Sequence, residues 1–137
     1  MLSLISSDFI LKSTLSITGN LIYNINYIRN FKFYDNELKS IFVDGDILSD
    51  IGIIKIYIEE FDGVTDLSPS LKAAIQNLNE TLVFLEKEIN ILTSKIKDHH
   101  LKWFASYRSY GIDREKQQIL ILIQQMNHRF DMLLKIQ

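Results

Sequence analysis

One long hydrophobic seam constrains this chain more than any other feature. Between residues 69 and 99, leucine and isoleucine recur at alternating steps of four and three, which is a heptad pattern with a period of 3.5 residues. Its members are Leu71, Ile75, Leu78, Leu82, Leu85, Ile89, Leu92 and Ile96. Ser68 is a favourable N-cap and Pro69 suits the first helical position. The seam predicts a helix over 69–99 whose apolar edge must be covered along its whole length.

The last part of the chain predicts a second long helix, over 113–136, with Asp113 as a candidate N-cap after Gly111. Its inner face is expected to consist of Ile119, Leu122 or Ile123, Met126, Phe130 and Leu133. Leu120, Ile121 and Leu134 are expected to widen this face. A wide apolar face indicates more than one packing neighbour, so the helix belongs to a bundle and not to a two-stranded coil.

The first half of the chain predicts two further elements. A helix over 7–30 is expected to pack through Leu11, Leu15, Thr18, Ile22 and Ile25, with Ile17, Leu21 and Ile28 beside this face. Gly19 in its interior is expected to allow a close helix approach. The second element, over 35–61, steps by threes and fours through a set of isoleucines and is expected to break near residues 43–46. Its stretch "GIIKIYIEEF", residues 52–61, also alternates like a strand. Helix is preferred because no other segment offers a partner strand, and the strand remains the alternative.

These elements predict an all-α fold, a four-to-five-helix bundle with long antiparallel C-terminal helices. A length of 137 residues is most simply one domain over 1–137, and five glycines with one proline favour few, long elements. There is no cysteine, which excludes disulfides and thiolate metal sites. The structural core is expected to contain Leu71, Ile75, Leu78, Leu82, Leu85, Ile89, Leu92, Trp103, Ile119, Met126 and Phe130.

The connection "LKWFASYRSYGID", residues 101–113, holds the only tryptophan of the chain. Trp103 is accompanied by Phe104, Tyr107 and Tyr110, a large aromatic area between two helices. A tryptophan there can close one end of the bundle while its indole N–H finds a polar partner. We expect a core plug in preference to a ligand site.

Charge is unevenly distributed along the chain. Residues 35–66 carry nine acidic residues against Lys39 and Lys55, whereas residues 95–137 carry eight basic residues against four acidic ones. The two segments are expected to pack as neighbours that compensate each other, in preference to forming a basic binding face. With a net charge of −2, nucleic acid is not an expected partner.

The sequence shows neither an export signal nor an apolar run that approaches the ~20 residues needed to span a bilayer. The expected location is therefore cytoplasmic, and binding to a membrane surface is compatible with it.

No pattern in the chain predicts catalytic chemistry. His99 and His100 point about 100° apart on a helix and His128 has no nearby partner, so no metal site is expected. The "DGDILSD" stretch, residues 44–50, fails as a calcium loop because Ser49 and Lys55 occupy the required glycine and glutamate positions. Phosphate-loop and nucleophile-elbow motifs are absent. We therefore expect no enzyme, no cofactor and no small-molecule substrate.

The N-terminal segment is more apolar than one helix face requires. Phe9 and Leu11 point about 200° apart on a helix, so one neighbour cannot bury both. Leu2, Leu4, Ile5 and Phe9 are candidate contacts to a membrane or to a second chain. The preferred alternative is that this segment simply caps the core.

Several stretches together resemble a known family. They are "SPSLKAAIQNLNETLVFLEKEI" (residues 68–89), "HHLKWF" (99–104), "EKQQILILIQQMNHRFDMLL" (115–134), "YIRN" (27–30) and "NELKSI" (36–41). In this order they resemble the HeLo-like N-terminal domains of fungal STAND receptors and ankyrin-repeat proteins. Many members of that family have proline where this chain has Phe104.

The resemblance implies a helical bundle used in signalling. Relatives of the HeLo type, and more distantly the four-helix bundle of the mixed-lineage kinase-like pseudokinase, execute regulated cell death by perturbing membranes. The function expected by resemblance is therefore non-enzymatic signalling through self-association or partner binding, with membrane contact possible. The alternative is a structural or scaffold bundle, of coiled-coil-like interaction type, without membrane activity.

Overall fold

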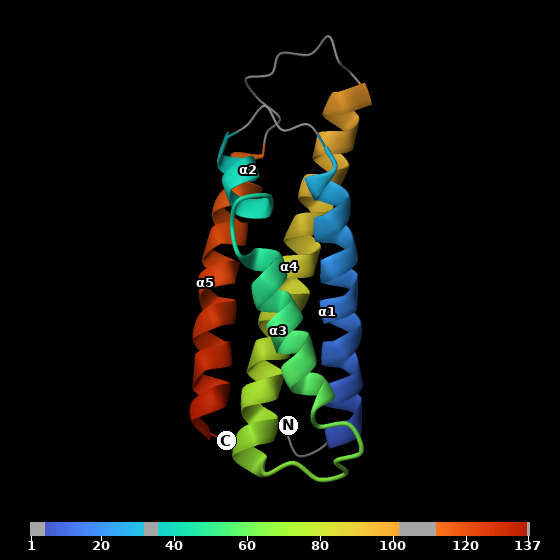
Figure 1. Ribbon diagram of the computed structural model, residues 1–137, viewed down its shortest axis with the longest axis vertical. Coiled ribbons are helices and arrows are strands. Elements are labelled where there is room, and N and C mark those ends of the chain that lie inside the picture. Colours follow the sequence, from blue (N-terminus) through green and yellow to red (C-terminus); the bar gives the residue numbers. More distant parts are fainter. Residues whose placement is uncertain (1–4, 32–35, 102–111, 137) are drawn as a thin grey trace.

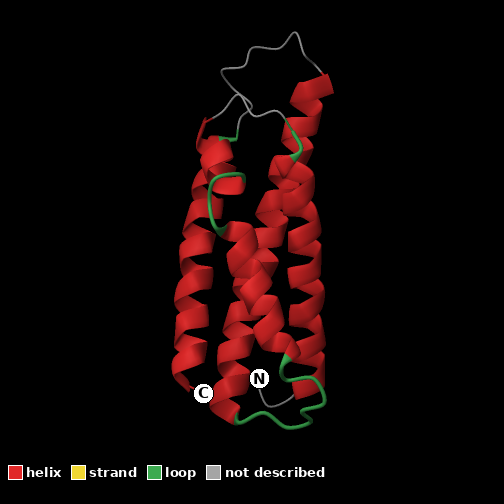
Figure 2. Ribbon diagram, viewed as in Figure 1, coloured by secondary structure: helices red, strands yellow, loops and turns green. Residues whose placement is uncertain are grey.

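The computed structural model describes residues 5–31, 36–101 and 112–136, and the regular elements within these residues are all α-helices (Figures 1 and 2). They are α1 (Ser7–Arg29), α2 (Asn36–Phe42), α3 (Ile47–Glu59), α4 (Pro69–Leu101) and α5 (Asp113–Ile136). The all-α prediction is confirmed, and the fold is a helical bundle. None of these described helices combines the length and the apolar composition that a bilayer-crossing helix needs.

The four long helices alternate in direction along the chain. Figure 1 shows α1 and α4 running one way and α3 and α5 the other, so the pairing of α4 with α5 is antiparallel as predicted. Helix α1 packs against both α3 and α4, whereas α5 packs chiefly on α4 and only lightly on α2 and α3. The connection between α3 and α4 runs beneath one end of the bundle, opposite the end that carries α2.

Side-chain caps set the starts of α1 and α4. The Ser6 hydroxyl accepts a hydrogen bond from the Phe9 N–H at 3.1 Å, and the Ser68 hydroxyl accepts one from the Leu71 N–H at 3.3 Å. Each cap satisfies a backbone donor that has no partner inside its helix. Pro69 is the first residue of α4, where its missing N–H costs nothing. The start predicted for the longest helix is therefore confirmed.

The element expected over 35–61 is two helices, and the break falls at residues 43–46 as expected. Gly45 lies in this break, and a Cβ there would come within 2.7 Å of the Ile41 carbonyl oxygen. The strand alternative for residues 52–61 is wrong, because α3 continues through residue 59. Isoleucines at helical spacing are buried, while Ile53 and Ile56 are exposed on the other side of α3. The strand-like alternation in the sequence arose because the exposed Ile56 lies between the buried Ile54 and Ile58.

The buried side chains form one core shared by all five helices. The α4 seam supplies fully buried residues along its length, and α5 adds two more from the expected set. These are Ile75, Leu78, Leu82, Leu85, Ile89, Leu92, Ile119 and Met126. Leu71 and Phe130 are half-buried and pack against this core. Trp103 lies outside the described residues.

The buried face of α1 agrees with the expected one at Leu11, Thr18, Leu21, Ile25 and Ile28 and is rotated from it elsewhere. Leu15 and Ile22 are only half-buried, whereas the stripe inside the bundle is Ile10, Leu11, Thr14, Thr18, Leu21, Ile25 and Ile28. The buried threonine hydroxyls are hydrogen-bonded: Thr14 donates to the Ile10 carbonyl at 2.8 Å and accepts from the Asn79 amide at 2.9 Å. This polar contact with α4 turns α1 toward a face that apolar periodicity alone does not mark.

The expectation that Leu120, Ile121 and Leu134 widen the inner face of α5 is wrong. All three side chains are exposed. The reason is that α5 has only one extensive neighbour, α4, so a single narrow stripe is covered. The apolar residues at the two edges of that stripe face solvent.

The two glycines inside helices α1 and α3 give a stability prediction. A Cβ added to Gly19 or to Gly52 would meet nothing within 4 Å, so Gly19 does not serve a close helix approach. Because alanine restricts the unfolded chain and fits a helix, Gly19→Ala and Gly52→Ala should each raise the free energy of unfolding by roughly 0.5–1 kcal/mol. Chemical denaturation followed by circular dichroism measures this.

Gly63→Ala is the matched control for these substitutions. Gly63 has φ +83°, which a residue with a Cβ adopts only at a cost, so this change should lower the stability of the chain. A loss of stability in Gly19→Ala or Gly52→Ala would contradict the open space around the two helical glycines.

Candidate interaction surface

The outward side of α1 is unusual for a surface helix because it is uncharged over most of its length. No charged residue lies between Lys12 and Arg29. Tyr23 and Tyr27, one helical turn apart, stand on this side, with 73% and 38% of their surface exposed. Solvated helices usually carry charges on such a face. Exposure to solvent alone therefore does not account for a helix face that consists of tyrosine, asparagine and serine.

Polar contacts with α4 fix the position of this face. The Asn24 amide donates to the Asn90 side-chain oxygen at 3.0 Å, and the Asn79 amide donates to the hydroxyls of Ser13 and Thr14 at 3.2 and 2.9 Å. These side-chain bonds join the parallel helices at two levels. They hold Tyr23 and Tyr27 next to the C-terminal part of α4.

An open hollow of about 290 Å³ lies between the two helices at this level. It is lined by Tyr23, Asn24, Tyr27, Asn90, Thr93, Ser94 and Lys97. We call these seven residues the tyrosine face. The Lys97 ammonium sits 4.8 Å from the centre of the Tyr27 ring, an attractive cation–π arrangement. Tyr27 also meets Phe31 edge-on, with ring centres 5.1 Å apart, so its ring is held in place.

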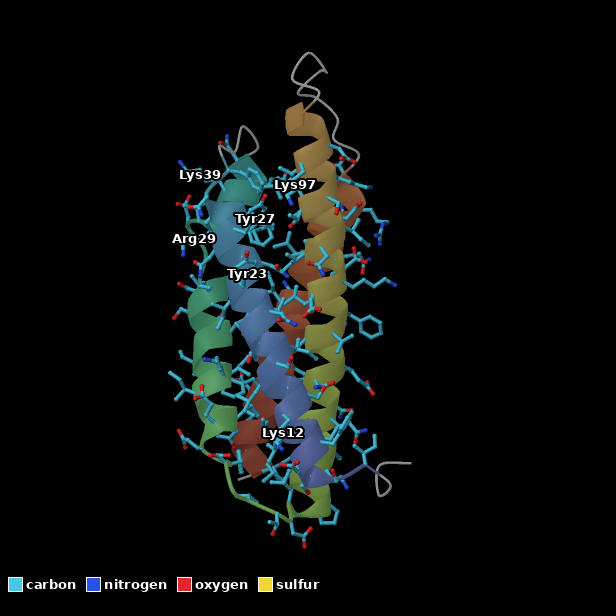
Figure 3. All side chains as sticks on the ribbon, turned by 90° about the vertical axis from the view of Figure 1, so that its right-hand side faces the viewer. Lys12, Tyr23, Tyr27, Arg29, Lys39 and Lys97 are labelled. Atoms are coloured by element: carbon cyan, nitrogen blue, oxygen red, sulfur yellow. The ribbon has the colours of Figure 1, made fainter. Side chains whose placement is uncertain are left out.

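Cationic side chains flank the tyrosines on both sides. Figure 3 shows Tyr23 and Tyr27 with Lys97 on one side and Arg29 on the other, whereas Lys12 lies toward the opposite end of α1. Within the described part of the chain, no ion pair engages Arg29, Lys39 or Lys97, while Lys12 pairs with Asp8 at 3.1 Å. The surroundings of the tyrosine face are therefore positive.

The N-terminal residues expected to contact a membrane or a second chain are only partly described. Leu2 and Leu4 lie outside the described residues. Ile5 is half-buried against the core, and Phe9 is 62% exposed while its neighbour on the chain, Ile10, is buried. Leu11 is buried as well, as the opposed directions of Phe9 and Leu11 require. Phe9 is thus available at the end of α1 that is remote from the tyrosine face.

A second hollow, of about 460 Å³, lies between α4 and α5 near the C-terminal end of α5. Its one guanidinium, that of Arg129, is already used: it donates to the Asn77 carbonyl and to the Thr81 hydroxyl, both at 2.7 Å. His128 also lines this hollow and is exposed. Among the residues described, no group of histidine and acidic side chains could hold a metal ion. The polar groups of this hollow serve the packing of α5 on α4.

A buried ionic cluster joins α4 and α5 near the start of α5. The Glu115 side chain is 1% exposed and pairs with Lys95, while Arg114 pairs with Glu88 at 3.0 Å and lies 3.8 Å from Glu115. Burial acts to raise the pKa of Glu115. The hydrogen bond from Lys95, the backbone hydrogen bond and the charges of Lys95 and Arg114 together outweigh it and hold that pKa below its ordinary value. Each acid here has a basic partner, so the cluster is structural.

Among the described residues, the ion pair between Lys116 and Glu37 shows the compensation expected between the acidic and basic segments. Lys116 of α5 lies 3.6 Å from Glu37 of α2. The other described pairs of α5 with another helix, those of Glu115 and Arg114, connect to α4. Most of the acidic residues over 35–66 therefore face solvent and not the basic segment.

Comparison with known proteins gives no match: no family model, no curated protein and no solved structure corresponds to this chain.

Proposed function

We propose that this chain is a non-enzymatic interaction bundle that acts by binding protein, foremost a second copy of itself. The observation that carries the proposal is the tyrosine face. Protein interfaces are distinguished by fewer charged residues at their centre and by more tyrosine, with charges at the rim. The tyrosine face has this composition: an uncharged centre with Tyr23 and Tyr27, and Lys97 and Arg29 beside it.

The fixed position of the Tyr27 ring also supports binding. Tyrosine offers a large contact area at a low entropy cost, and asparagine and serine beside it supply adaptable hydrogen bonds. The Tyr27 ring is already fixed by Phe31 and Lys97. A partner would therefore lose little of its binding energy to ordering this part of the surface. The signalling role implied by the HeLo-like resemblance is compatible with such a bundle and forms part of the proposal.

Sedimentation velocity over a wide range of protein concentration tests the proposal. We expect reversible self-association that Tyr23→Ala weakens about tenfold, the effect of removing one strong interface side chain. Because the Tyr23 side chain is mostly exposed, Tyr23→Ala should leave the free energy of unfolding of the chain unchanged. Ile56→Ala, which removes an exposed isoleucine from α3, is the matched control and should associate like the unaltered chain.

Two outcomes would count against the proposal. A chain that stays monomeric at every concentration would contradict self-association. A chain whose association is weakened by Ile56→Ala and not by Tyr23→Ala would show that the tyrosine face is the wrong surface.

Membrane contact is a second candidate function, favoured by the exposure of Phe9. An exposed phenylalanine at a helix end can enter a lipid interface, yet the nearby Lys12 is paired with Asp8, which reduces its attraction to anionic lipid. Dye leakage from anionic liposomes that is lost in Phe9→Ser would support this function. Equal leakage, or no leakage, from both forms would remove it and leave a scaffold bundle without membrane activity.

A further inference from the structure

The end of the bundle opposite α2 carries an acidic, ordered connection. We call residues 59–66 the acidic loop; its carboxylates belong to Glu59, Glu60, Asp62 and Asp66, all exposed. Lys55 pairs with Glu59 at 3.6 Å, and no described ion pair engages the other three. In Figure 1 this connection lies at the lower end of the bundle, and the C-terminal end of α1 lies at the upper end.

Backbone contacts hold the acidic loop in shape. The Val64 N–H donates to the Phe61 carbonyl at 2.9 Å across a turn in which Gly63 has φ +83°. Just beyond the loop, Leu67 is buried and its N–H donates to the Ser7 hydroxyl at 3.1 Å. Between Asp62 and Asp66 the loop presents Val64, an exposed apolar side chain. The loop is therefore a pre-formed projection with an apolar centre and acidic flanks.

The tyrosine face has the complementary character. The face is hollow whereas the loop projects, and its tyrosine rings can pack against an aliphatic side chain. Lys97 in the face and Arg29 beside it carry the charge opposite to that of the loop carboxylates. Resting on the function proposed above, we infer that the acidic loop of one copy binds the tyrosine face of the next, with Val64 over the tyrosines and Asp62 and Asp66 toward the cations. The contact is head-to-tail.

Electrostatics favour this pairing over a symmetric one. Two tyrosine faces placed together would bring Lys97 and Arg29 of one copy near the same cations of the other, which is repulsive. The acidic loop has the opposite charge. Because the contact joins two different surfaces at opposite ends, it leaves a free surface on each side and builds chains or closed rings. It should weaken as salt is added.

Two described carboxylates near the hollow bear on the orientation of the loop. Glu86 is half-buried and lies one helical turn before Asn90. It is about 16 Å along α4 from Lys97. Asp98 follows Lys97 but points about 100° away around the helix. Glu86 makes the side of the hollow nearer the middle of α1 unfavourable for a carboxylate. The loop should therefore approach from the Lys97 and Arg29 side.

A mixing experiment with two half-defective variants tests the head-to-tail contact. The face variant carries Tyr23→Ala and Lys97→Ala, and the loop variant carries Asp62→Asn and Asp66→Asn. Each keeps one working surface. By sedimentation velocity, each alone should be monomeric where the unaltered chain forms larger species, and an equal mixture should form a one-to-one dimer and nothing larger. Glu80→Gln, on the exposed outer side of α4, is the control and should assemble like the unaltered chain.

The outcomes separate this inference from the proposed function. If the face variant loses assembly while the loop variant keeps it, the tyrosine face binds another surface, so the head-to-tail inference is overturned and the proposed function stands. A mixture that stays monomeric also overturns the inference. If the unaltered chain itself is monomeric at every concentration, both are overturned. Circular dichroism and denaturation midpoints of the two variants, expected to match the unaltered chain, exclude unfolding as the cause.

Discussion

Leu82→Ala is expected to lower the free energy of unfolding by about 2–5 kcal/mol. Leu82 lies at the middle of the α4 seam and is fully buried. Its removal takes apolar surface out of the core and leaves a cavity, because α4 is held by α1 on one side and by α5 on the other and cannot move to fill the space. Domains are stable by only about 5–15 kcal/mol in total, so this single change removes a large share. Denaturant unfolding followed by far-UV circular dichroism measures it.

The matched control is two residues further along the same helix. Phe84 is a larger side chain than Leu82, but it is exposed on the surface of α4. Phe84→Ala should therefore change the stability by no more than about 0.5 kcal/mol. If the two substitutions cost the same, or if Leu82→Ala leaves the unfolding midpoint in place, the α4 seam does not form the centre of this core.

Helix α4 was predictable because its information is local. The heptad spacing marks the buried edge, and Ser68 with Pro69 marks the start, without reference to any other segment. The buried face of α1 was less accessible to sequence reasoning. Thr14 is inside the bundle because Asn79, 65 residues away, donates to its hydroxyl, and no local pattern announces that contact. The exposed flanks of α5 were mispredicted for the same reason, since the number of neighbours is a tertiary property.

The sequence contains a pattern that indicates the tyrosine face, but the pattern can be interpreted only when the fold is known. A helix with no charge between Lys12 and Arg29 and with tyrosines at a spacing of four is not an ordinary solvated helix. The asparagines of that stretch looked only like weak helix formers. What the sequence alone could not supply is the register that places Asn90 and Lys97 of α4 beside Asn24 and Tyr27 of α1, a separation of 66 residues for the asparagine pair.

Lys95→Met is expected to have the second large effect, a loss of roughly 3 kcal/mol at neutral pH. The Glu115 carboxylate is buried, and Lys95 is its principal partner, with Arg114 more distant at 3.8 Å. Removing one member of such a pair leaves a charge away from water without full compensation, which typically costs 3–5 kcal/mol. The lower end of that range applies because Arg114 remains and because the Lys95 side chain is 42% exposed.

The pH dependence of this loss has a definite sign. In the unaltered chain the pKa of Glu115 lies below its ordinary value of 4.5, so its contribution to stability is present above that pH and is lost as the pH falls through the folded-state pKa. Without Lys95, burial, which acts to raise this pKa, meets only the backbone hydrogen bond and Arg114. We expect the pKa to rise in the variant. The stability deficit of Lys95→Met should then shrink as the pH is lowered from neutral toward 4.5.

A double variant distinguishes this electrostatic cause from lost packing. Replacing both partners, Lys95→Met with Glu115→Met, leaves no buried charge, and such replacements are often neutral or stabilising, so most of the deficit at neutral pH should be recovered. Asp50, whose pKa is raised by burial, titrates in all three proteins and cancels in the comparison. A deficit in Lys95→Met that is independent of pH, or that persists in the double variant, would mean that the Lys95 side chain acts through its packing on α4 and α5 and not as the counter-charge of Glu115.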